Sequence, residues 1–202
     1  MTPNAQQLVA ELDAALGSAP VKRRVAIMRK VTDVYVEGAG HFSDEQVQFF
    51  DIVMKLLAQR VGREALIELV GLLANTDNAP AETVNRLAQD EDIAVAGPLL
   101  QNSNALVDNV LVEIAKGKGQ KHLLAIAARA RINAVITDAL IGRGFTDVVR
   151  KVVANEGAEL SENTFVRLIN DCNRDKALAK QISQRKDIPE ELQPFLKLAL
   201  GA

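Results

Sequence analysis

The sequence predicts an all-α protein in which an N-terminal helical region leads into a stacked array of helix pairs. Apolar dipeptides recur about every 26 to 28 residues, a spacing typical of stacked repeats. They are Leu87-Ala88, Ile114-Ala115, Leu140-Ile141 and Leu168-Ile169. A second apolar run follows each dipeptide after a polar break, and aromatic residues make up only 3% of the chain. A unit this short cannot bury its own apolar face, so neighbouring units must stack.

Four helices are expected in the N-terminal region, residues 1–75, because apolar residues recur there at helical spacing between Gly and Pro breaks. They cover Gln6–Leu16, Val21–Val36, the segment from Ser43 to Gly62, and Arg63–Ala74.

The third of these helices has the clearest predicted start. Ser43 and Gln46 have the spacing of a capping box, and Phe42 and Val47 have that of a hydrophobic staple. We therefore expect the helix to begin directly after Ser43.

The repeats are expected to occupy residues 76–202, as about four helix pairs and a partial one, after the polar segment Asn75–Pro80. Ser161 is predicted to cap a helix, and Ile188–Glu191 to open the partial unit. Pro98, inside the second helix of the first pair, predicts a kink or a late start there. No segment alternates polar and apolar residues as a strand would.

The composition is ordinary for a soluble protein of one or two domains: 202 residues, 48% hydrophobic and 25% charged. There is no run of about 18 apolar residues that could span a membrane, and the N-terminus lacks the pattern of a signal peptide. Cys172 has no second cysteine to pair with, so we expect a buried, reduced thiol. These features favour a cytoplasmic protein.

The net charge of −2 hides an uneven distribution of charged residues. From Glu37 to Asp92 there are eleven Asp and Glu against four Lys and Arg. From Lys116 to Lys151 there are eight Lys and Arg against two Asp. This pattern is either an ordinary solvated surface or a basic middle that meets an acidic partner, including the acidic half of a second copy.

Several segments resemble an uncharacterised bacterial family, domain of unknown function 2336. They are Asp90–Ala96 with Pro98–Leu100, and Gly119–Ala127, in which the run Gln120–Ala127 is the most specific. Shorter matches extend the resemblance over about residues 20–195. Units such as Val148–Asn155 are similar to leucine-rich-repeat-variant and HEAT-like repeats. The resemblance implies a right-handed α-solenoid of HEAT-like helix pairs, and it implies no activity or ligand.

No catalytic or metal-binding pattern stands out, so we expect no enzyme, no cofactor and no metal. The histidines His41 and His122 have no Cys or carboxylate at a recognised ligand spacing. Thr137 and Asp138 form a polar pair inside an apolar helix and are expected to cap or bridge neighbouring units. Asp138 has no partner nucleophile that would make it a general base.

The candidate binding surface combines the basic segment with the ends of the second helices. Its residues are Lys118, Gln120, Lys121, His122, Arg129, Arg150 and Asn155. Gly and Lys before a helix can hold an anion, although an interhelix turn is the simpler interpretation around Lys118. For His122 an interhelix hydrogen bond is favoured.

Equivalent positions in successive units hold Asn102, Arg129, Asn155 and Arg185. These side chains either cap the carbonyl ends of helices or project toward a ligand.

The sequence thus favours a non-enzymatic scaffold that binds a protein partner along one face, with the basic middle selecting the partner by charge. A homodimer is compatible with this, because the last unit is apolar at Phe195 and Leu198. The alternatives are nucleic-acid binding through residues 116–151 and sensing of a small anionic ligand. The acidic total and the scarcity of aromatic side chains disfavour nucleic acid.

Overall fold

The computed structural model describes residues 3–172 and 174–201, with residues 3–9 and 12 described by their backbone alone. Within this part of the chain there are thirteen α-helices, one short 3-10 helix (η1) and no β-strand. The all-α prediction is therefore confirmed. An isolated parallel bridge joins Ile132 and Ala158. None of the described helices combines the length and the apolar character that crossing a bilayer requires.

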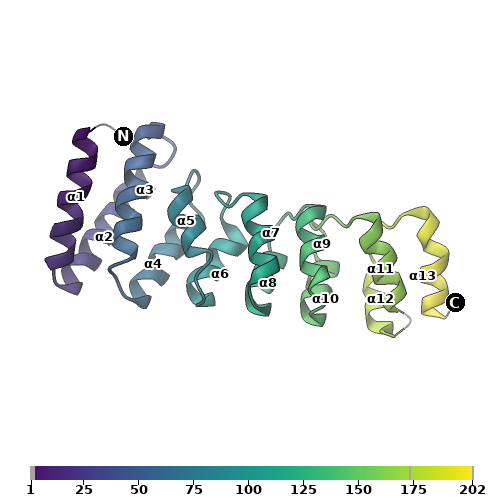
Figure 1. The fold of residues 1–202 in the computed structure, drawn as a ribbon. Helices are drawn as coiled ribbons and strands as arrows, with labels where there is room; N and C mark the ends of the chain where they lie inside the picture. Colours follow the sequence, from purple (N-terminus) through teal and green to yellow (C-terminus); the bar gives the residue numbers. More distant parts are fainter. Residues whose placement is uncertain (1–2, 173, 202) are drawn as a thin grey trace. The chain divides into compact units, whose positions relative to one another are not determined.

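The chain divides into two compact units, Met1–Val107 and Asp108–Ala202. The first unit contains α1 Pro3–Ser18, α2 Val21–Glu37, α3 Asp44–Ala58, α4 Arg63–Leu73, α5 Ala81–Leu87 and α6 Ile93–Asn102 (Figure 1). In this unit α3 contacts α1 and α5, whereas α4 contacts α2 and α6. Odd-numbered and even-numbered helices thus form two rows, and α2–α3, α4–α5 and α5–α6 pack across them.

The second unit repeats this arrangement. It contains α7 Asp108–Gly117, α8 Gln120–Ala127, α9 Ala134–Gly142, α10 Thr146–Ala154, α11 Glu162–Cys172, α12 Lys176–Ile182, η1 Glu190–Leu192 and α13 Gln193–Leu200. In one row α7 contacts α9 and α11 contacts α13, while in the other row α10 contacts α8 and α12. The predicted helix pairs are present as α5–α6, α7–α8, α9–α10 and α11–α12, and η1 with α13 follows where a partial unit is expected.

The recurring apolar dipeptides lie in the core. All eight of their residues are buried, and the most exposed of them, Ile169, has 5% of its surface accessible. Small and branched aliphatic side chains at these positions let neighbouring helices approach closely, which explains why a core with so few aromatic residues suffices.

Three aromatic side chains cluster in the first unit. The ring of Tyr35 on α2 lies 5.5 Å from that of Phe42 and 5.0 Å from that of Phe50. Its hydroxyl donates a hydrogen bond to the carbonyl of Asn78, at 2.5 Å. The polar segment between α4 and α5 is therefore tied to α2.

Local capping explains where several helices begin. The Oγ of Ser43 accepts from the backbone N–H of Gln46 (3.3 Å), and the Gln46 side chain accepts from the Ser43 N–H (2.8 Å). This reciprocal pair confirms the predicted capping box. Ser161 likewise accepts from the N–H of Thr164 at 3.2 Å, as predicted.

Of the two outcomes predicted at Pro98, a kink or a late helix start, the late start is wrong. Helix α6 begins at Ile93 and continues through Pro98. Asp92 caps it by accepting from the Ala94 N–H at 3.0 Å. The cap fixes the first turn, and the proline then removes only one later backbone donor.

The predicted boundary between residues 75 and 76 stays a prediction. Residues 75–80 do form the connection between α4 and α5, but the division into compact units falls after Val107. Helices α1–α4 share the two-row contacts of the later pairs, which the sequence pattern did not indicate.

Candidate functional site

Carboxylates on one helix hold the N-terminal end of the next helix in the same row. Asp51 of α3 accepts from the backbone N–H (2.8 Å) and the Oγ1 (2.6 Å) of Thr83 at the start of α5. Asp138 of α9 accepts from Ser161 Oγ (2.8 Å) and Thr164 Oγ1 (2.5 Å) at the start of α11. The expectation that Asp138 bridges neighbouring helix pairs is confirmed.

Side chains beyond the end of one helix hold carbonyl groups at the end of the preceding helix in the same row. Arg143, Asn155 and Arg185 do this after α9, α10 and α12. Arg143 donates to the carbonyl oxygens of Ala115, Lys116 and Lys118, and Asn155 donates to those of Ala127 and Arg129. Arg185 donates to those of Val153, Asn155 and Ala158. All of these distances are 2.6–3.1 Å. Such carbonyls have no partner within their own helix. For Asn155 and Arg185 these bonds support the carbonyl-capping interpretation.

The turns and linkers of the second unit lie at two opposite ends of its helices. At the hairpin end lie the turns within each pair, which include residues 118–119, 143–145 and 174–175. At the linker end lie the connections between pairs, residues 128–133, 155–161 and 183–189. Lys118, Gln120 and Lys121 belong to the hairpin end, whereas Arg129 and Asn155 belong to the linker end. The structure therefore does not bring the candidate residues together on one surface.

The linker end contains two adjoining hollows of about 370 and 480 Å³ that share Glu156 and Asp187. We call them together the linker groove. Its polar lining consists of Asp108, Arg129, Arg131, Asn133, Glu156, Glu159, Gln181, Gln184, Arg185, Lys186 and Asp187. The groove thus takes side chains from three successive linkers, and it carries both signs of charge.

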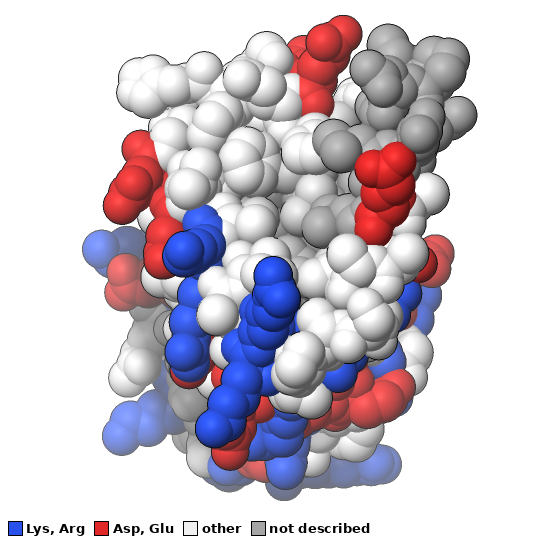
Figure 2. Space-filling view, turned by 90° about the vertical axis from the view of Figure 1, so that its left-hand side faces the viewer, with Lys and Arg blue, Asp and Glu red and all other residues white. Residues whose placement is uncertain are grey.

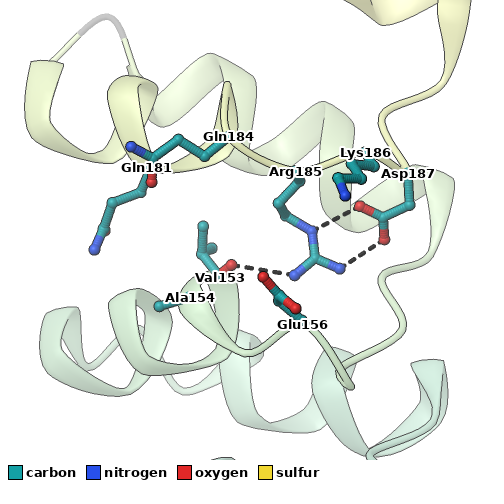
Figure 3. Close-up of a pocket in the computed structure, with 8 residues that line it drawn as sticks. All are labelled: Val153, Ala154, Glu156, Gln181, Gln184, Arg185, Lys186 and Asp187. Carbon is teal, nitrogen blue, oxygen red and sulfur yellow. Dashed lines mark hydrogen bonds and ion pairs between the residues drawn. The ribbon is translucent and has the colours of Figure 1, made fainter.

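Arg185 forms a rigid part of the groove wall. Figure 3 shows its guanidinium between Glu156 and Asp187, with Gln181 and Gln184 farther along the hollow. Its Nε and Nη2 donate to the Asp187 carboxylate at 2.8 and 2.6 Å, and only 8% of its side chain is exposed. Because its other donors hold backbone carbonyls, Arg185 positions the groove and leaves ligand contacts to its neighbours.

A close backbone approach sets the spacing of the first two linkers. The Ile132 N–H donates to the Gly157 carbonyl (3.0 Å), and the Glu159 N–H donates to the Ile132 carbonyl (2.8 Å). A Cβ on Gly157 would lie 1.9 Å from the carbonyl oxygen of Ala130. Only glycine fits there, so this residue fixes how closely the two sides of the groove approach each other.

Of the candidate binding residues named from the sequence, Arg129 is a charged residue that lines the linker groove. Burial lowers the pKa of its guanidinium, and the nearby carboxylate of Asp108 opposes that effect. Arg131 and Lys186 are exposed, as are Glu156 and Glu159. Arg131 belongs to the basic segment noted in the sequence but was not among the candidate residues. Sequence reasoning missed Glu156, Glu159 and Lys186, because only the fold brings their linkers together with that of Arg131.

Arg150 lies in a different pocket. Its Nη2 donates to Asp175 at 2.9 Å, and it borders a cavity of about 230 Å³ together with Arg167 and Arg174. We call this cavity, which lies between the α9–α10 and α11–α12 hairpins, the hairpin pocket.

The remaining candidates at the hairpin end have different environments. Gln120 donates to the carboxylate of Asp147 at 3.0 Å, so its amide links α8 to α10. Lys121 is exposed. His122 is only 5% exposed, because it lies on the inward side of α8 beside the buried Leu123. Burial removes His122 from any exposed binding surface and agrees with the structural role that was favoured for it.

The first unit carries basic residues outside the predicted segment. Figure 2 views this unit from the α1 side, and Lys and Arg side chains gather in the lower half of the view. Helix α2 contributes exposed Lys22, Arg23 and Lys30. Arg29, also on α2, is paired with Glu68 of α4, at 2.8 Å. The first unit still carries 14 Asp and Glu against nine Lys and Arg, so these basic side chains form a local area on a unit that is acidic overall.

Metal-ligating and nucleophilic groups are sparse in the described part of the chain. No group of three or more His, Cys, Asp and Glu lies there in an arrangement that would hold a metal ion. Burial, reinforced by Asp175 and Asp171, raises the pKa of the Cys172 thiol to about 11, and its Sγ contacts the Leu168 carbonyl at 3.1 Å. A thiol with this pKa is protonated at neutral pH and is a poor nucleophile.

Comparison with known proteins finds a family match that begins in α6 of the first unit and extends through most of the second. A family model described as an uncharacterised protein conserved in bacteria (DUF2336) matches residues 95–195. No curated protein and no solved structure gives a significant match to the chain.

Proposed function

We propose that this chain, which belongs to DUF2336, a family of uncharacterised proteins conserved in bacteria, is a non-enzymatic α-solenoid that binds a segment of a protein partner. The proposal assigns the contact surface to the linker groove of the second unit. It also assigns HEAT-like character to the helix pairs.

The two-row packing supports the solenoid part of the proposal. Helices two positions apart along the chain pack against each other in both units, as in α1–α3, α4–α6, α7–α9 and α10–α12. Helix α9 reaches the start of α11 through the hydrogen bonds of Asp138. Carboxylates bind the starts of helices, and Arg or Asn side chains bind the carbonyl groups at the ends of helices, so that successive helices in a row are tied together. These ties hold consecutive pairs in register, so that residues from successive linkers keep fixed relative positions.

The observation that carries the binding part is the groove itself. Its two hollows, of about 370 and 480 Å³, adjoin each other and take their lining from three linkers. Hollows of this size accommodate side chains or small ligands. Two in succession, bordered by both acidic and basic side chains, fit a polypeptide segment that offers several different side chains.

The chemistry of the lining favours binding over nucleophilic catalysis. The groove offers carboxylates, amides, guanidinium groups and one lysine amine, but no hydroxyl, thiol or imidazole among its lining residues. Asn155, beside the groove, and Arg185, in its wall, donate side-chain hydrogen bonds to backbone carbonyl oxygens.

A pull-down with matched charge reversals tests the proposal. The groove variant is Arg131→Glu with Lys186→Glu, and the control is Lys116→Glu with Lys151→Glu. All four residues are exposed and lie in the same unit, so both variants change the net charge equally. Both should melt within about 2 °C of the wild type, because exposed substitutions have small effects on stability.

We expect the wild type and the control to recover the same protein and the groove variant to bind it about ten-fold more weakly or worse, a loss of about 1.4 kcal/mol. Equal recovery by the groove variant would reject the groove as the contact surface. Recovery of nucleic acid with no protein would reject the scaffold proposal altogether.

A further inference from the structure

We propose that the hairpin pocket binds an anionic group, a carboxylate or a phosphate, carried by the partner. This inference rests on the proposed function, and it adds the chemistry of one contact that the linker groove does not supply. The groove is lined by charges of both signs, whereas the hairpin pocket gathers three arginines.

The lining of the pocket suits a charged head group on an apolar stem. Ile141, Val149 and Leu178 supply apolar surface, and Arg150, Arg167 and Arg174 supply guanidinium groups around a cavity of about 230 Å³. A water molecule occupies about 30 Å³ in the liquid, so the cavity has room for a phosphate or carboxylate with part of its side chain. Arginine forks match the geometry of both groups.

Arg150 is held in place by a carboxylate that is itself anchored. Asp175 accepts from the Leu178 N–H at 3.0 Å as the cap of α12, and it accepts from Arg150 at 2.9 Å. The hydrogen bond from Arg150 lowers the pKa of Asp175, and the bond from Leu178 adds to this. Asp175 is thus a positioning residue: it orients Arg150, whose remaining N–H groups are available to an anion.

Arg167 and Arg174 provide the free positive charge. Both are exposed, and neither side chain forms a hydrogen bond or ion pair with any residue that the structure describes. Once Arg150 and Asp175 neutralise each other, these two arginines face a single carboxylate, that of Asp171. The pocket therefore keeps an excess of positive charge and ten guanidinium N–H donors on two side chains.

The start of α10 reinforces this charge. Gly144 and Thr146 line the pocket, and Thr146 is the first residue of α10. The residue before it, Phe145, gives no side-chain cap, so the first backbone N–H groups of this helix have no side-chain acceptor. Unsatisfied N–H groups at a helix start favour a negative charge nearby.

The test is an NMR titration of the full chain with two small probes, N-acetyl-phosphoserine amide and N-acetyl-glutamic acid amide, at constant ionic strength. Backbone amides of Thr146, Asp147 and Leu178 report on the pocket. The pocket variant is Arg167→Gln with Arg174→Gln, and the matched control is Lys116→Gln with Lys151→Gln, which line neither the hairpin pocket nor the linker groove. Exposed side chains are changed in both, so both variants should fold.

We expect saturable shifts at the pocket amides with a Kd of about 1 mM, the affinity of a single ionic contact, and about five-fold weaker binding in the pocket variant alone. Tighter binding of phosphoserine would identify a phosphorylated partner, and equal binding of the two probes an acidic one. Shifts that do not saturate, or that are equal in the pocket variant, would overturn the inference.

The outcome is separable from that of the pull-down. A failed titration with a successful pull-down would remove the anion pocket and leave the scaffold. Binding of the probes by a chain that recovers no protein would instead indicate a site for a free anion, and the pocket would then have no role in partner recognition.

Discussion

At the scale of single residues, the geometry of the second unit depends on positions that carry little or no side chain. Gly157 lets two linkers approach through the backbone, and Asn155 and Arg185 hold carbonyls on either side of it. In the proposed function these residues position the groove, because they determine where its other lining residues lie.

Replacing Gly157 by alanine should destabilise the second unit by about 2–4 kcal/mol, because the new Cβ would lie 1.9 Å from the Ala130 carbonyl oxygen and the linkers must separate. Urea denaturation followed by circular dichroism measures this change. Gly142→Ala is the matched control, since a Cβ there meets no atom within 4 Å. Similar stabilities for the two variants would show that the close approach is not a constraint.

Sequence reasoning identified several residues by their local chemistry. The capping role of Ser43 follows from its spacing to Gln46, and the bridging role of Asp138 follows from a polar residue inside an apolar helix. It could not identify Gly157 as a close contact, because the other side of that contact, Ala130, lies 27 residues earlier and only the fold brings the two together.

At the scale of helices and turns, one bonding pattern recurs. A carboxylate on one helix binds the start of the next helix in its row, and an Arg or Asn beyond one helix binds the end of the preceding helix. The pattern satisfies backbone and hydroxyl groups that would otherwise lack partners where helices meet.

The Asp138→Ala substitution tests this pattern. It removes the acceptor of two hydroxyl donors, Ser161 and Thr164, and we expect a loss of about 1–2 kcal/mol in the free energy of unfolding. Glu113→Ala, an exposed carboxylate on α7, is the control and should change stability by about 0.5 kcal/mol or less. If thermal denaturation gives the same melting temperature for both variants, the ties contribute nothing to stacking.

The helix pairs were predictable because their apolar dipeptides keep an almost constant spacing. The early helices were not recognised as part of the same pattern, and their lengths explain why. Helices α1–α3 have 15–17 residues, whereas α5–α12 have 7–11, so the period read from the later pairs does not extend back to them. The helix does not start late at Pro98, because Asp92 caps its first turn and the proline removes only one later backbone donor.

At the scale of the whole molecule, both proposed contact sites lie in the second unit, at opposite ends of its helices. Residues that are neighbours in sequence are distributed between these ends, because each hairpin turn and each linker reverses the chain. This is why the basic segment from Lys116 to Lys151 does not form one surface. The groove instead combines residues such as Arg131, Glu156 and Lys186, which are far apart in sequence.

The most direct test of the central claim is site-specific photo-crosslinking in living cells. A benzophenone amino acid replaces Lys186 in the linker groove or, as the control, Lys151 on the exposed side of α10. The account predicts that one protein is crosslinked at position 186 and not at position 151, and that Arg131→Glu abolishes the adduct. An identical set of adducts at both positions, or none at position 186, would contradict it.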